Sequence, residues 1–558
     1  MIATSFHEYN RRATNNVSRA REFFPDVRNH FGFFILIPDT LPALLAQRIN
    51  NAVPALVDRG RPVSYRGLAG ESRRLAQGLH RLGVRGGDCV ALWLPNLPAW
   101  LSAFFACAQL GAIAVSVNTR FRSRELADIL HRSRARALVF WPDFKGIDFA
   151  GILAACDPQA LGHLESVVVY GETGERVPQT LLGKAAHAYA TLAASAPLPA
   201  DGAAPDAGCA IFTTSGTTRA PKFVMHDQRT VIRHAFDVAA GFGIGPGATL
   251  LLAPPLCGVF GFCSAMAAIA AGRPLVMAPA WDAAQAARDL ATHRITHLNG
   301  TDEACAQLLD CGADFSNIRF FGYAAFNPAH ADIVQRADAR GLRLVGLYGT
   351  SEIQALFARQ PEDAPAEERG LGGGRPVSAL ARVRVRDPQS GAALEHGAAG
   401  ELEFYAPASR MARYHGDPVA TREAITPDGW YRSGDLGYTL ADGRFVYQTR
   451  IGDSLRLGGF LVSPAEIEAV VQEVPGIAAC QVVGVERREG LVPVAFVLLR
   501  PGASPDEAAV IAHVGGRLAR YKVPARVFPI DAFPVTPGAN ATKIQKGKLR
   551  EMAEALLH

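Results

Sequence analysis

Hydrophobic residues follow two different periods along residues 62–140, which predicts helices alternating with short buried strands. Ser64 and Ser123 are placed to cap two of the helices. The predicted elements are a helix from Ser64 to about Leu82, a second over 99–109 and a third from Ser123, with strands over 89–94, 112–115 and 137–140. Wholly apolar strands between helices indicate a parallel sheet covered on both faces. The alternation recurs over 208–350, which predicts a second sheet of this kind.

The pattern changes between about 376 and 450, where strand-like runs are separated by turn signals. Asp428-Gly429 and Asp442-Gly443 are dipeptides typical of hairpins, so a small antiparallel unit is predicted there. A compact terminal segment follows Asp453, and its first helix is marked by a Ser463 cap, Pro464 in the first turn and Glu466 at the third position.

The predicted fold class is α/β. We expect a large N-terminal domain over 1–452, with two doubly wound parallel-sheet subdomains and a β-rich subdomain at about 376–450. A small α+β C-terminal domain over 453–558 would complete the chain.

Composition narrows the class of protein. At 558 residues the chain is too long for one core, while 49% hydrophobic and 20% charged residues are ordinary for a globular protein. A net charge of +5 is too mild to suggest nucleic-acid binding. Nine scattered cysteines lack the spacing of zinc sites, which favours reduced thiols in a cytoplasmic protein.

Neither a secretory signal nor a transmembrane segment is expected. The first 26 residues are polar and contain several arginines. Two long uncharged stretches, 99–117 and 238–272, are long enough to be considered as spanning helices. Prolines and glycines interrupt the second, and the first is better explained as a buried helix followed by a strand.

Residues 213–222, Thr-Thr-Ser-Gly-Thr-Thr-Arg-Ala-Pro-Lys, lie directly after an apolar strand-like run. Gly216 would let backbone N–H groups point inward, and Lys222 would supply a positive charge. The hydroxyls that would donate to phosphate oxygens are those of Thr214, Ser215, Thr217 and Thr218. The spacing is not that of a Walker loop. The segment predicts a polyphosphate cradle, and its alternative is a Ser/Thr-rich surface loop.

Further segments in order along the chain carry a resemblance to a known family. They are 255–261 (PLCGVFG), 348–352 (YGTSE), 400–402 (GEL), 429–435 (GWYRSGD), 450–453 (RIGD), 464–468 (PAEIE), 521–524 (YKVP) and 542–546 (TKIQK). With the cradle, they make the chain similar to the adenylate-forming superfamily of acyl-CoA synthetases, luciferases and adenylation domains. Each segment is weak alone, and their order over nearly the whole chain makes the resemblance specific.

The resemblance implies a site for ATP and Mg²⁺. The cradle would hold the β- and γ-phosphates, and Glu352, with Thr217, would bind Mg²⁺. Tyr348 would stack on adenine, or be a core aromatic at a strand end. Asp435 would accept hydrogen bonds from both ribose hydroxyls, or be a turn residue, and Arg450 would reach the ribose or phosphates. Further nucleotide contacts would be Ala324, Ala325, Gly349, Thr350 and Ser351.

The resemblance also implies a mobile C-terminal domain. Lys543 would close on the α-phosphate and the carboxylate during adenylation, although Lys546 and Lys548 are close enough in sequence for the assignment to shift. Asp453 matches the hinge position. Gly458 and Gly459 would line the channel for the pantetheine arm of CoA.

Departures from the family pattern concern the acyl group. The implied acyl pocket contains Cys257, Gly258, Val259, Phe260 and Tyr323. Cys257-Gly258 replaces a commoner aromatic-His pair, Tyr323-Ala324-Ala325 replaces Gly-Gly-Ala, and Arg219 and Phe223 replace glycines. The apolar strip at 255–263 favours a medium-chain, alicyclic or aryl acid.

The sequence therefore predicts an ATP-dependent acid–CoA ligase that forms an acyl-adenylate and then a thioester, with ATP, Mg²⁺ and CoA as cofactor and co-substrates. The partners would be a small carboxylic acid and CoA, in a monomer or homodimer. One alternative is an adenylate former that loads a carrier protein. Another is a catalytically silent nucleotide- or acyl-binding relative, against which the retention of Glu352, Asp435, Arg450 and Lys543 argues.

Overall fold

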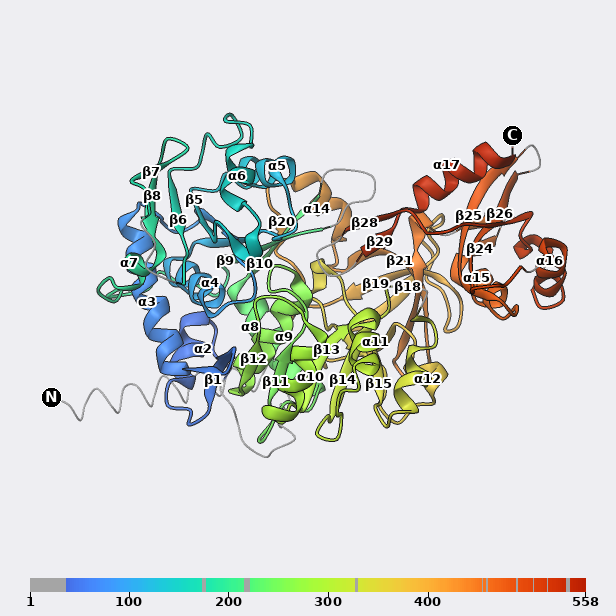
Figure 1. The fold of residues 1–558 in the computed structure, drawn as a ribbon, viewed down its shortest axis with the longest axis horizontal. Helices are drawn as coiled ribbons and strands as arrows, with labels where there is room; N and C mark the ends of the chain where they lie inside the picture. The colour runs from blue at the N-terminus through green and yellow to red at the C-terminus, as the bar shows by residue number, and fades with distance from the viewer. Residues whose placement is uncertain are drawn as a thin grey trace. The chain divides into compact units, whose positions relative to one another are not determined.

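The computed structural model describes residues 37–172, 177–214, 221–326, 330–453, 455–457, 460–487, 490–504, 506–518, 520–537 and 542–557. Residues 39–558 form a compact unit that contains every helix and strand named below (Figure 1).

The first sheet has nine strands in the order β20-β10-β9-β4-β3-β5-β6-β8-β7. Its parallel strands are β3 (Cys89–Trp93), β4 (Ile113–Ser116), β5 (Ala137–Phe140), β6 (Ser166–Val169), β8 (Lys184–Ala188) and β9 (Gly208–Thr213). The edges are antiparallel: β10 (Phe223–Asp227), β20 (Arg413–Tyr414) and β7 (Thr180–Leu181).

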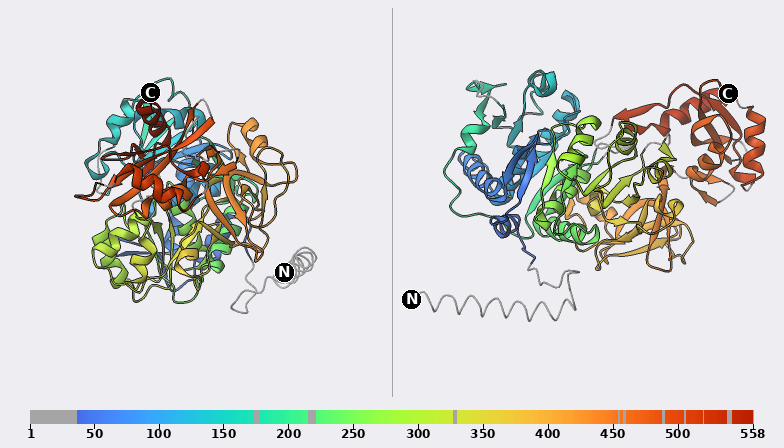
Figure 2. Two further views of the ribbon diagram at one scale, coloured as in Figure 1. Left: turned by 90° about the vertical axis from the view of Figure 1, so that its right-hand side faces the viewer. Right: turned by 60° about the horizontal axis from the view of Figure 1, so that its bottom comes forward.

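Helices cover both faces of this sheet, as the apolar strands predicted (Figure 2). Alternate strand residues contribute to two separate cores, so each face is buried against its own helices. The helices are α3 (Tyr65–Arg81), α4 (Pro98–Leu110) and α7 (Tyr189–Ala193) for one core, and α5 (Ser123–Ser133) and α6 (Phe149–Ala154) for the other.

The second sheet has thirteen strands in the order β18-β19-β21-β22-β17-β16-β15-β14-β13-β11-β12-β1-β2. Its parallel part comprises β1 (Pro54–Asp58), β11 (Leu250–Leu252), β12 (Leu275–Met277), β13 (His297–Thr301), β14 (Phe320–Ala324) and β15 (Leu344–Tyr348), with β2 (Arg61–Ser64) antiparallel at the edge. Its helices are α2 (Leu41–Arg48), α8 (Gln228–Gly241), α9 (Val259–Ala271), α10 (Ala283–Thr292), α11 (Asp302–Asp310) and α12 (Ile333–Asp338).

The largest core lies between the two sheets. Helices α4 and α9 contain almost only buried residues, and the rings of Phe104 and Phe262 meet edge to face with centroids 5.0 Å apart. Helices that are apolar all round are typical of a position between two layers. Residues 99–117 and the α9 segment are therefore buried in the protein interior, and among the described residues no helix is both long and apolar enough to cross a bilayer.

The predicted antiparallel unit exists, but its strands extend the second sheet. They are β16 (Ala358–Arg359), β17 (Gly373–Pro376), β18 (Arg382–Arg386), β19 (Gly400–Tyr405), β21 (Tyr431–Thr439) and β22 (Phe445–Arg450), with helices α13 (Ala366–Arg369) and α14 (Pro418–Ala424). Asp442-Gly443 forms the predicted hairpin between β21 and β22. Asp428-Gly429 also lies in a tight antiparallel turn, which leads from α14 into β21. Ile425 and Tyr431 form a β-bridge around it, and the Thr426 N–H donates to the Trp430 carbonyl at 2.8 Å.

The terminal segment is α+β, as predicted. A three-stranded sheet is formed by β25 (Ile477–Arg487), β26 (Gly490–Leu499) and β27 (Arg526–Pro529). Two hairpins, β23 (Leu455–Leu457) with β24 (Phe460–Val462) and β28 (Val535–Pro537) with β29 (Thr542–Ile544), accompany it. The helices are α15 (Pro464–Gln472), α16 (Glu507–Gly515) and α17 (Lys546–Leu557).

The predicted helix caps had different outcomes. Ser64 caps α3, because its Oγ accepts from the Gly67 N–H at 3.0 Å. Ser123 is the first residue of α5, and the cap position belongs to Arg122, whose N–H donates to Glu125 at 2.9 Å. Ser463 occupies the cap position of α15, but its side chain makes no capping hydrogen bond.

Candidate active site

A pocket of about 260 Å³ joins three of the predicted site residues, Lys222, Glu352 and Arg450. Lys222 directly precedes β10, Glu352 lies in a short 3₁₀ turn over Ser351–Ile353, and Arg450 ends β22. The rest of the lining is Glu401, Tyr414, Ala420, Glu423, Ala424, Tyr431, Arg432, Ser433 and Gly434. Segments more than two hundred residues apart in sequence therefore build one site.

The two ends of the predicted cradle are fixed against each other. The Thr214 N–H donates to the Lys222 carbonyl at 3.0 Å, and the Lys222 N–H donates to Thr214 Oγ1 at 3.2 Å. These bonds continue the antiparallel pairing of β9 with β10. Ser215, Gly216, Thr217, Thr218 and Arg219 lie outside the described residues, so their roles stay predictions.

Glu352 is buried in the pocket and is held by a residue that sequence reasoning missed. The Tyr414 hydroxyl donates to Glu352 Oε1 at 2.8 Å, and both residues are less than 10% exposed. Lys222 Nζ lies 4.7 Å from the centre of the Tyr414 ring, within reach of a cation–π contact. One tyrosine therefore contacts both the carboxylate and the cation predicted to face phosphates.

Burial and the adjacent Glu352 carboxylate raise the pKa of Tyr414 far above its ordinary value. The hydroxyl therefore remains a donor throughout the working pH range. Strand β20, which carries Tyr414, has only two residues and pairs with β10. Such a short strand carries no periodic signal, so the sequence offered no way to place this side chain.

Asp435, Tyr348 and Arg450 form a second connected group. Asp435 is 2% exposed and accepts a 2.5 Å hydrogen bond from the Tyr348 hydroxyl. Arg450 Nε lies 2.9 Å from Asp435 Oδ1, and Arg450 Nη1 donates to the Ser433 carbonyl at 2.9 Å. Burial raises the pKa of Asp435 to about 6, and the opposing effects of Arg450 and the Tyr348 hydroxyl do not cancel it.

The Tyr348 ring is packed as a core aromatic. Its centroid lies 5.3 Å from that of Phe404, 5.1 Å from that of Phe445 and 5.6 Å from that of Tyr447. The ring is therefore a core aromatic, as one interpretation of the sequence held. Its hydroxyl donates to Asp435, the residue predicted to bind the ribose, so Tyr348 also contacts the predicted nucleotide site. Adenine stacking on this ring stays a prediction.

The loop after β15 is tightly constrained. A Cβ at Gly349 would lie 2.8 Å from the Ala355 Cα, so only glycine fits without a shift. The carbonyl of Ser351 accepts from His226 Nε2 at 2.8 Å. Burial lowers the pKa of His226 to about 4, so this imidazole is neutral near pH 7.

Gln354, also missed from the sequence, secures the far side of this loop. Its backbone has a φ of 56°, and its Nε2 donates to the carbonyls of Thr230 at 3.1 Å and Ser409 at 3.3 Å. Positive φ in a residue other than glycine is strained, and such strain is concentrated at functional sites. Of the remaining predicted contacts, Thr350 is buried, whereas Ala324 is half-buried at the end of β14 and Ala325 follows it exposed.

The predicted acyl residues lie at the start of α9. Gly258 is the cap residue, Val259 and Phe260 begin the helix, and Cys257 precedes it. Asn96 fixes this turn, because its Oδ1 accepts from the Leu256 N–H at 2.7 Å and its Nδ2 donates to the Pro254 carbonyl at 3.3 Å.

Tyr323 does not join this group. Its side chain lies in the core between β14 and α11–α12, and its hydroxyl donates to the Gly370 carbonyl at 2.8 Å. Residues alternate between the faces of a strand, and the neighbouring Ala324 packs on the other core, with α9. Phe262 likewise packs fully within the core, so the apolar strip is only partly available to a ligand.

The C-terminal candidates are described in part. Asp453 ends a 3₁₀ turn over Ile451–Asp453, and Gly458 and Gly459 lie outside the described residues. Lys543 lies in β29 opposite Thr536. Lys546 Nζ is paired with Glu468 Oε1 at 3.2 Å.

Comparison with known proteins places this arrangement in a family. The profile described as AMP-binding enzyme matches residues 46–415, and that described as AMP-binding enzyme C-terminal domain matches residues 466–539. The chain therefore belongs to the AMP-binding enzyme family, as the sequence resemblance predicted.

Curated relatives and solved structures match nearly the whole chain. Sulfoacetate–CoA ligase of Cupriavidus necator is 32% identical over 533 residues, covering 92% of this chain and 97% of that protein. Feruloyl-CoA synthase of an Amycolatopsis species is 31% identical over 510 residues, covering 90% and 96%. The crystal structure of ATP-bound MatB from Rhodopseudomonas palustris has a TM-score of 0.79 at 24% identity, covering 93% and 100%, and supports the fold.

Proposed function

We propose that this protein is an ATP-dependent acid–CoA ligase of the AMP-forming type. A carboxylate would attack the α-phosphorus of ATP to give acyl-AMP and pyrophosphate, and the CoA thiol would then displace AMP to give the thioester. The observation that carries the proposal is the single pocket in which Lys222, Glu352 and Arg450 meet, with Arg450 joined to buried Asp435. The names of the curated relatives, a sulfoacetate–CoA ligase and a feruloyl-CoA synthase, agree with it.

Each group in the pocket has a chemical task in this reaction. Lys222, with the hydroxyls of Thr214, Ser215, Thr217 and Thr218, would bind the phosphates that leave as pyrophosphate. Asp435 would accept hydrogen bonds from the ribose hydroxyls, and Arg450 would hold Asp435 and the sugar. These contacts would fix ATP so that charge developing at phosphorus meets preplaced donors.

Mg²⁺ fits the chemistry of the donor set. The ion usually takes one or two carboxylates and completes its shell with phosphate oxygens and water. Glu352 offers a buried carboxylate whose Oε1 is oriented by Tyr414, beside Lys222. Glu352 and Thr217 would hold Mg²⁺, which supplies Lewis-acid neutralisation of the phosphates when bound.

The C-terminal domain would supply Lys543 and the CoA channel. We propose Lys543 as the catalytic lysine, as the resemblance implies. The pairing of Lys546 with Glu468 supports this choice over Lys546, and the Lys548 variant described below tests the other alternative. The domains would be 1–452 and 453–558, with Asp453 as hinge and Gly458 and Gly459 along the pantetheine path.

The acid is proposed to be apolar, of medium-chain, alicyclic or aryl type. Cys257, Gly258, Val259 and Phe260 provide small and apolar groups at the start of α9. A feruloyl-CoA synthase among the relatives agrees with an aryl acid. A sulfoacetate–CoA ligase at similar identity acts on a small anionic acid, so the relatives alone do not select the substrate.

The experiment is carboxylate-dependent exchange of labelled pyrophosphate into ATP across a panel of acids. The panel should include benzoates, cinnamates, medium-chain and alicyclic acids, and sulfoacetate. We expect exchange with at least one apolar acid, followed by thioester formation on adding CoA. No exchange with any acid would contradict the ligase and favour a silent binder.

Two variants separate the half-reactions. Lys543→Ala should abolish exchange and still form thioester from supplied acyl-AMP, whereas loss of both halves would mean that the lysine is misassigned. Lys548→Ala is the matched control and should leave exchange intact. If thioester forms with a carrier protein but not with CoA, the protein is an adenylate former that loads a carrier protein.

A further inference from the structure

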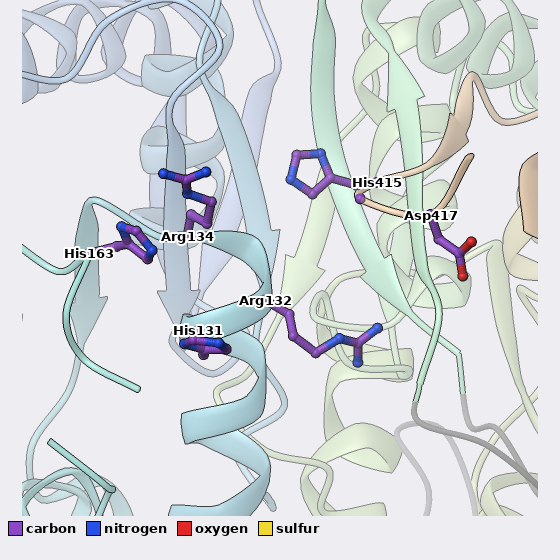
Figure 3. A pocket seen from close by; sticks show the side chains of 7 residues that line it. His131, Arg132, Arg134, His163, His415 and Asp417 are labelled. Atoms are coloured by element: carbon purple, nitrogen blue, oxygen red, sulfur yellow. The ribbon is translucent and has the colours of Figure 1, made fainter. Parts of the chain in front are cut away.

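A second pocket, of about 360 Å³, is lined mainly by basic side chains (Figure 3). Its residues come from the end of α5, from the segment before β6 and from the turn after β20. They are His131, Arg132, Arg134, His163, His415, Gly416 and Asp417, which we call the basic pocket. No residue of the basic pocket belongs to the proposed catalytic site.

The basic groups stand on two sides of the pocket. Figure 3 shows His131, Arg134 and His163 on one side and His415 and Asp417 on the other, with Arg132 extending from α5 toward the second side. Arg132 is held in place, because its guanidinium carbon lies 4.4 Å from the centre of the Phe223 ring and its Nη1 pairs with Asp128 at 3.0 Å. A ligand between the two sides would therefore meet donors from opposite directions.

Arg134 is the guanidinium group of the basic pocket that no described residue pairs. The other one, Arg132, pairs with Asp128 at 3.0 Å, and the lining also holds one carboxylate, that of Asp417. Asp417 Oδ1 already accepts from the Ala420 N–H at 2.9 Å, which caps α14. Arg134 is exposed, and its guanidinium has no ion-pair or hydrogen-bond partner among the described residues.

Arg136, a nearby arginine, has a structural role in which carboxylates pair with its guanidinium. Arg136 pairs with Glu165 at 2.8 Å and with Asp88 at 3.4 Å, and it does not line the pocket. Arg134, two residues away, lines the pocket and forms no ion pair among the described residues. The pocket therefore has donors available that the fold does not consume.

The histidines add donors without needing to be charged. Burial, and then the nearby Arg413, lower the pKa of His415, so its neutral ring still offers one N–H. No group of histidines and carboxylates in the described residues has the arrangement of a metal site. An anion with several acceptor oxygens matches this set better than a metal does.

The basic pocket lies across a strand pair from the proposed ATP site. Lys222 and Tyr414 line the first pocket. The residue after Tyr414, His415, lines the basic pocket, and the residue after Lys222, Phe223, packs against the Arg132 guanidinium. The two segments are joined there by the His415 N–H, which donates to the Phe223 carbonyl at 2.7 Å. Neighbouring residues of a strand point to opposite faces, so the two pockets are distinct.

We propose that the basic pocket binds the phosphate groups of a small molecule, separately from ATP in the first pocket. Guanidinium forks match phosphate oxygens, and donors on two sides suit a phosphate or diphosphate better than a flat carboxylate. Two sources carry this chemistry in the proposed reaction, free pyrophosphate and the phosphates of CoA. The choice of these sources rests on the proposed function, whereas the pocket itself does not.

The test is calorimetric titration of inorganic pyrophosphate into the full chain at low salt, in a Lys222→Ala background that weakens the first pocket. Arg134→Gln should weaken binding about 10-fold or more, the loss expected for one charge-assisted hydrogen bond. Arg124→Gln is the matched control, because Arg124 is an exposed arginine of α5 that does not line the pocket, and it should change binding less than about 2-fold. Both positions are exposed, so melting temperatures should stay unchanged.

Titrations of CoA and 3′-dephospho-CoA distinguish the sources. Weakening of CoA binding alone by Arg134→Gln would identify the 3′-phosphate of CoA, and weakening of both would identify its diphosphate. Weakening of pyrophosphate binding alone would identify free pyrophosphate. If Arg134→Gln weakens none of the three, or acts no more strongly than Arg124→Gln, the proposal is overturned. Because each readout is binding, this result is independent of whether the protein proves to be a ligase.

Discussion

The Tyr414 hydroxyl provides the sharpest test of how the proposed metal ligand is held. Tyr414→Phe removes one oxygen, the one that donates to Glu352 Oε1 at 2.8 Å, and leaves the buried ring in place. The ring contact with Lys222 should also persist. The substitution therefore isolates the orientation of a single carboxylate.

The expected effect follows from the type of bond. A hydrogen bond to a charged group contributes about 1.5–3 kcal/mol, and losing a partner that orients a metal ligand typically costs about 10- to 100-fold in metal affinity or activity. Tyr414→Phe should thus raise the Mg²⁺ concentration that gives half-maximal pyrophosphate exchange by about 10-fold or more. The KM of the acid should change little, since the acyl residues lie at the start of α9.

Tyr189→Phe is a matched control. Its hydroxyl donates to Glu71 Oε1 at 2.7 Å, so the same type of bond is lost at a place that does not line the pocket. Both variants should melt at lower temperature, and only Tyr414→Phe should shift the Mg²⁺ dependence. An unchanged Mg²⁺ dependence in folded Tyr414→Phe, or an equal shift in Tyr189→Phe, would refute the reasoning.

Three further predictions concern other parts of the chain. Burial raises the pKa of Asp435 to about 6, and ribose hydroxyls would favour its charged form, so ATP binding near pH 6 should release protons from this carboxyl. Calorimetry in two buffers of different ionisation enthalpy measures the release, and zero release would exclude the ribose role. Native protein should react with one equivalent of a thiol reagent, at Cys311, since the other eight cysteines are buried; mass spectrometry counts the adducts. Gly261→Ala should destabilise the fold by about 1–3 kcal/mol, because a Cβ there would collide with the Pro255 carbonyl, and chemical denaturation would detect it.

The fold could be predicted from the sequence wherever local signals are strong. Apolar strands between helices identified both parallel sheets, Ser64 marked the start of α3, and Asp442-Gly443 marked the β21–β22 hairpin. The extension of the second sheet by the antiparallel strands was missed. That pairing depends on β16 and β17, which contain two and four residues, too few for a period to be detected.

Candidate residues in the first pocket could be predicted by family resemblance, and the residues that position them could not. Lys222, Glu352 and Arg450 carry motifs, so their order along the chain was informative. Tyr414 and Gln354 act through contacts made only in the folded chain, such as the bond between Tyr414 and a glutamate 62 residues away. At Ser463 the sequence signal was clear but the predicted contact does not form. Ser463 occupies the cap position of α15 without making a capping hydrogen bond, and Glu466 pairs with Lys522.

The ion pair between Asp435 and Arg450 also has a mechanical meaning. The two residues are register partners of β21 and β22, and the 3₁₀ turn that ends at Asp453 begins at the next residue, Ile451. The chain is therefore clamped to the sheet immediately before the proposed hinge. A rotation at Asp453 would therefore leave Asp435 and Arg450 in place. The adenylate could stay bound to them while the C-terminal residues that face it change.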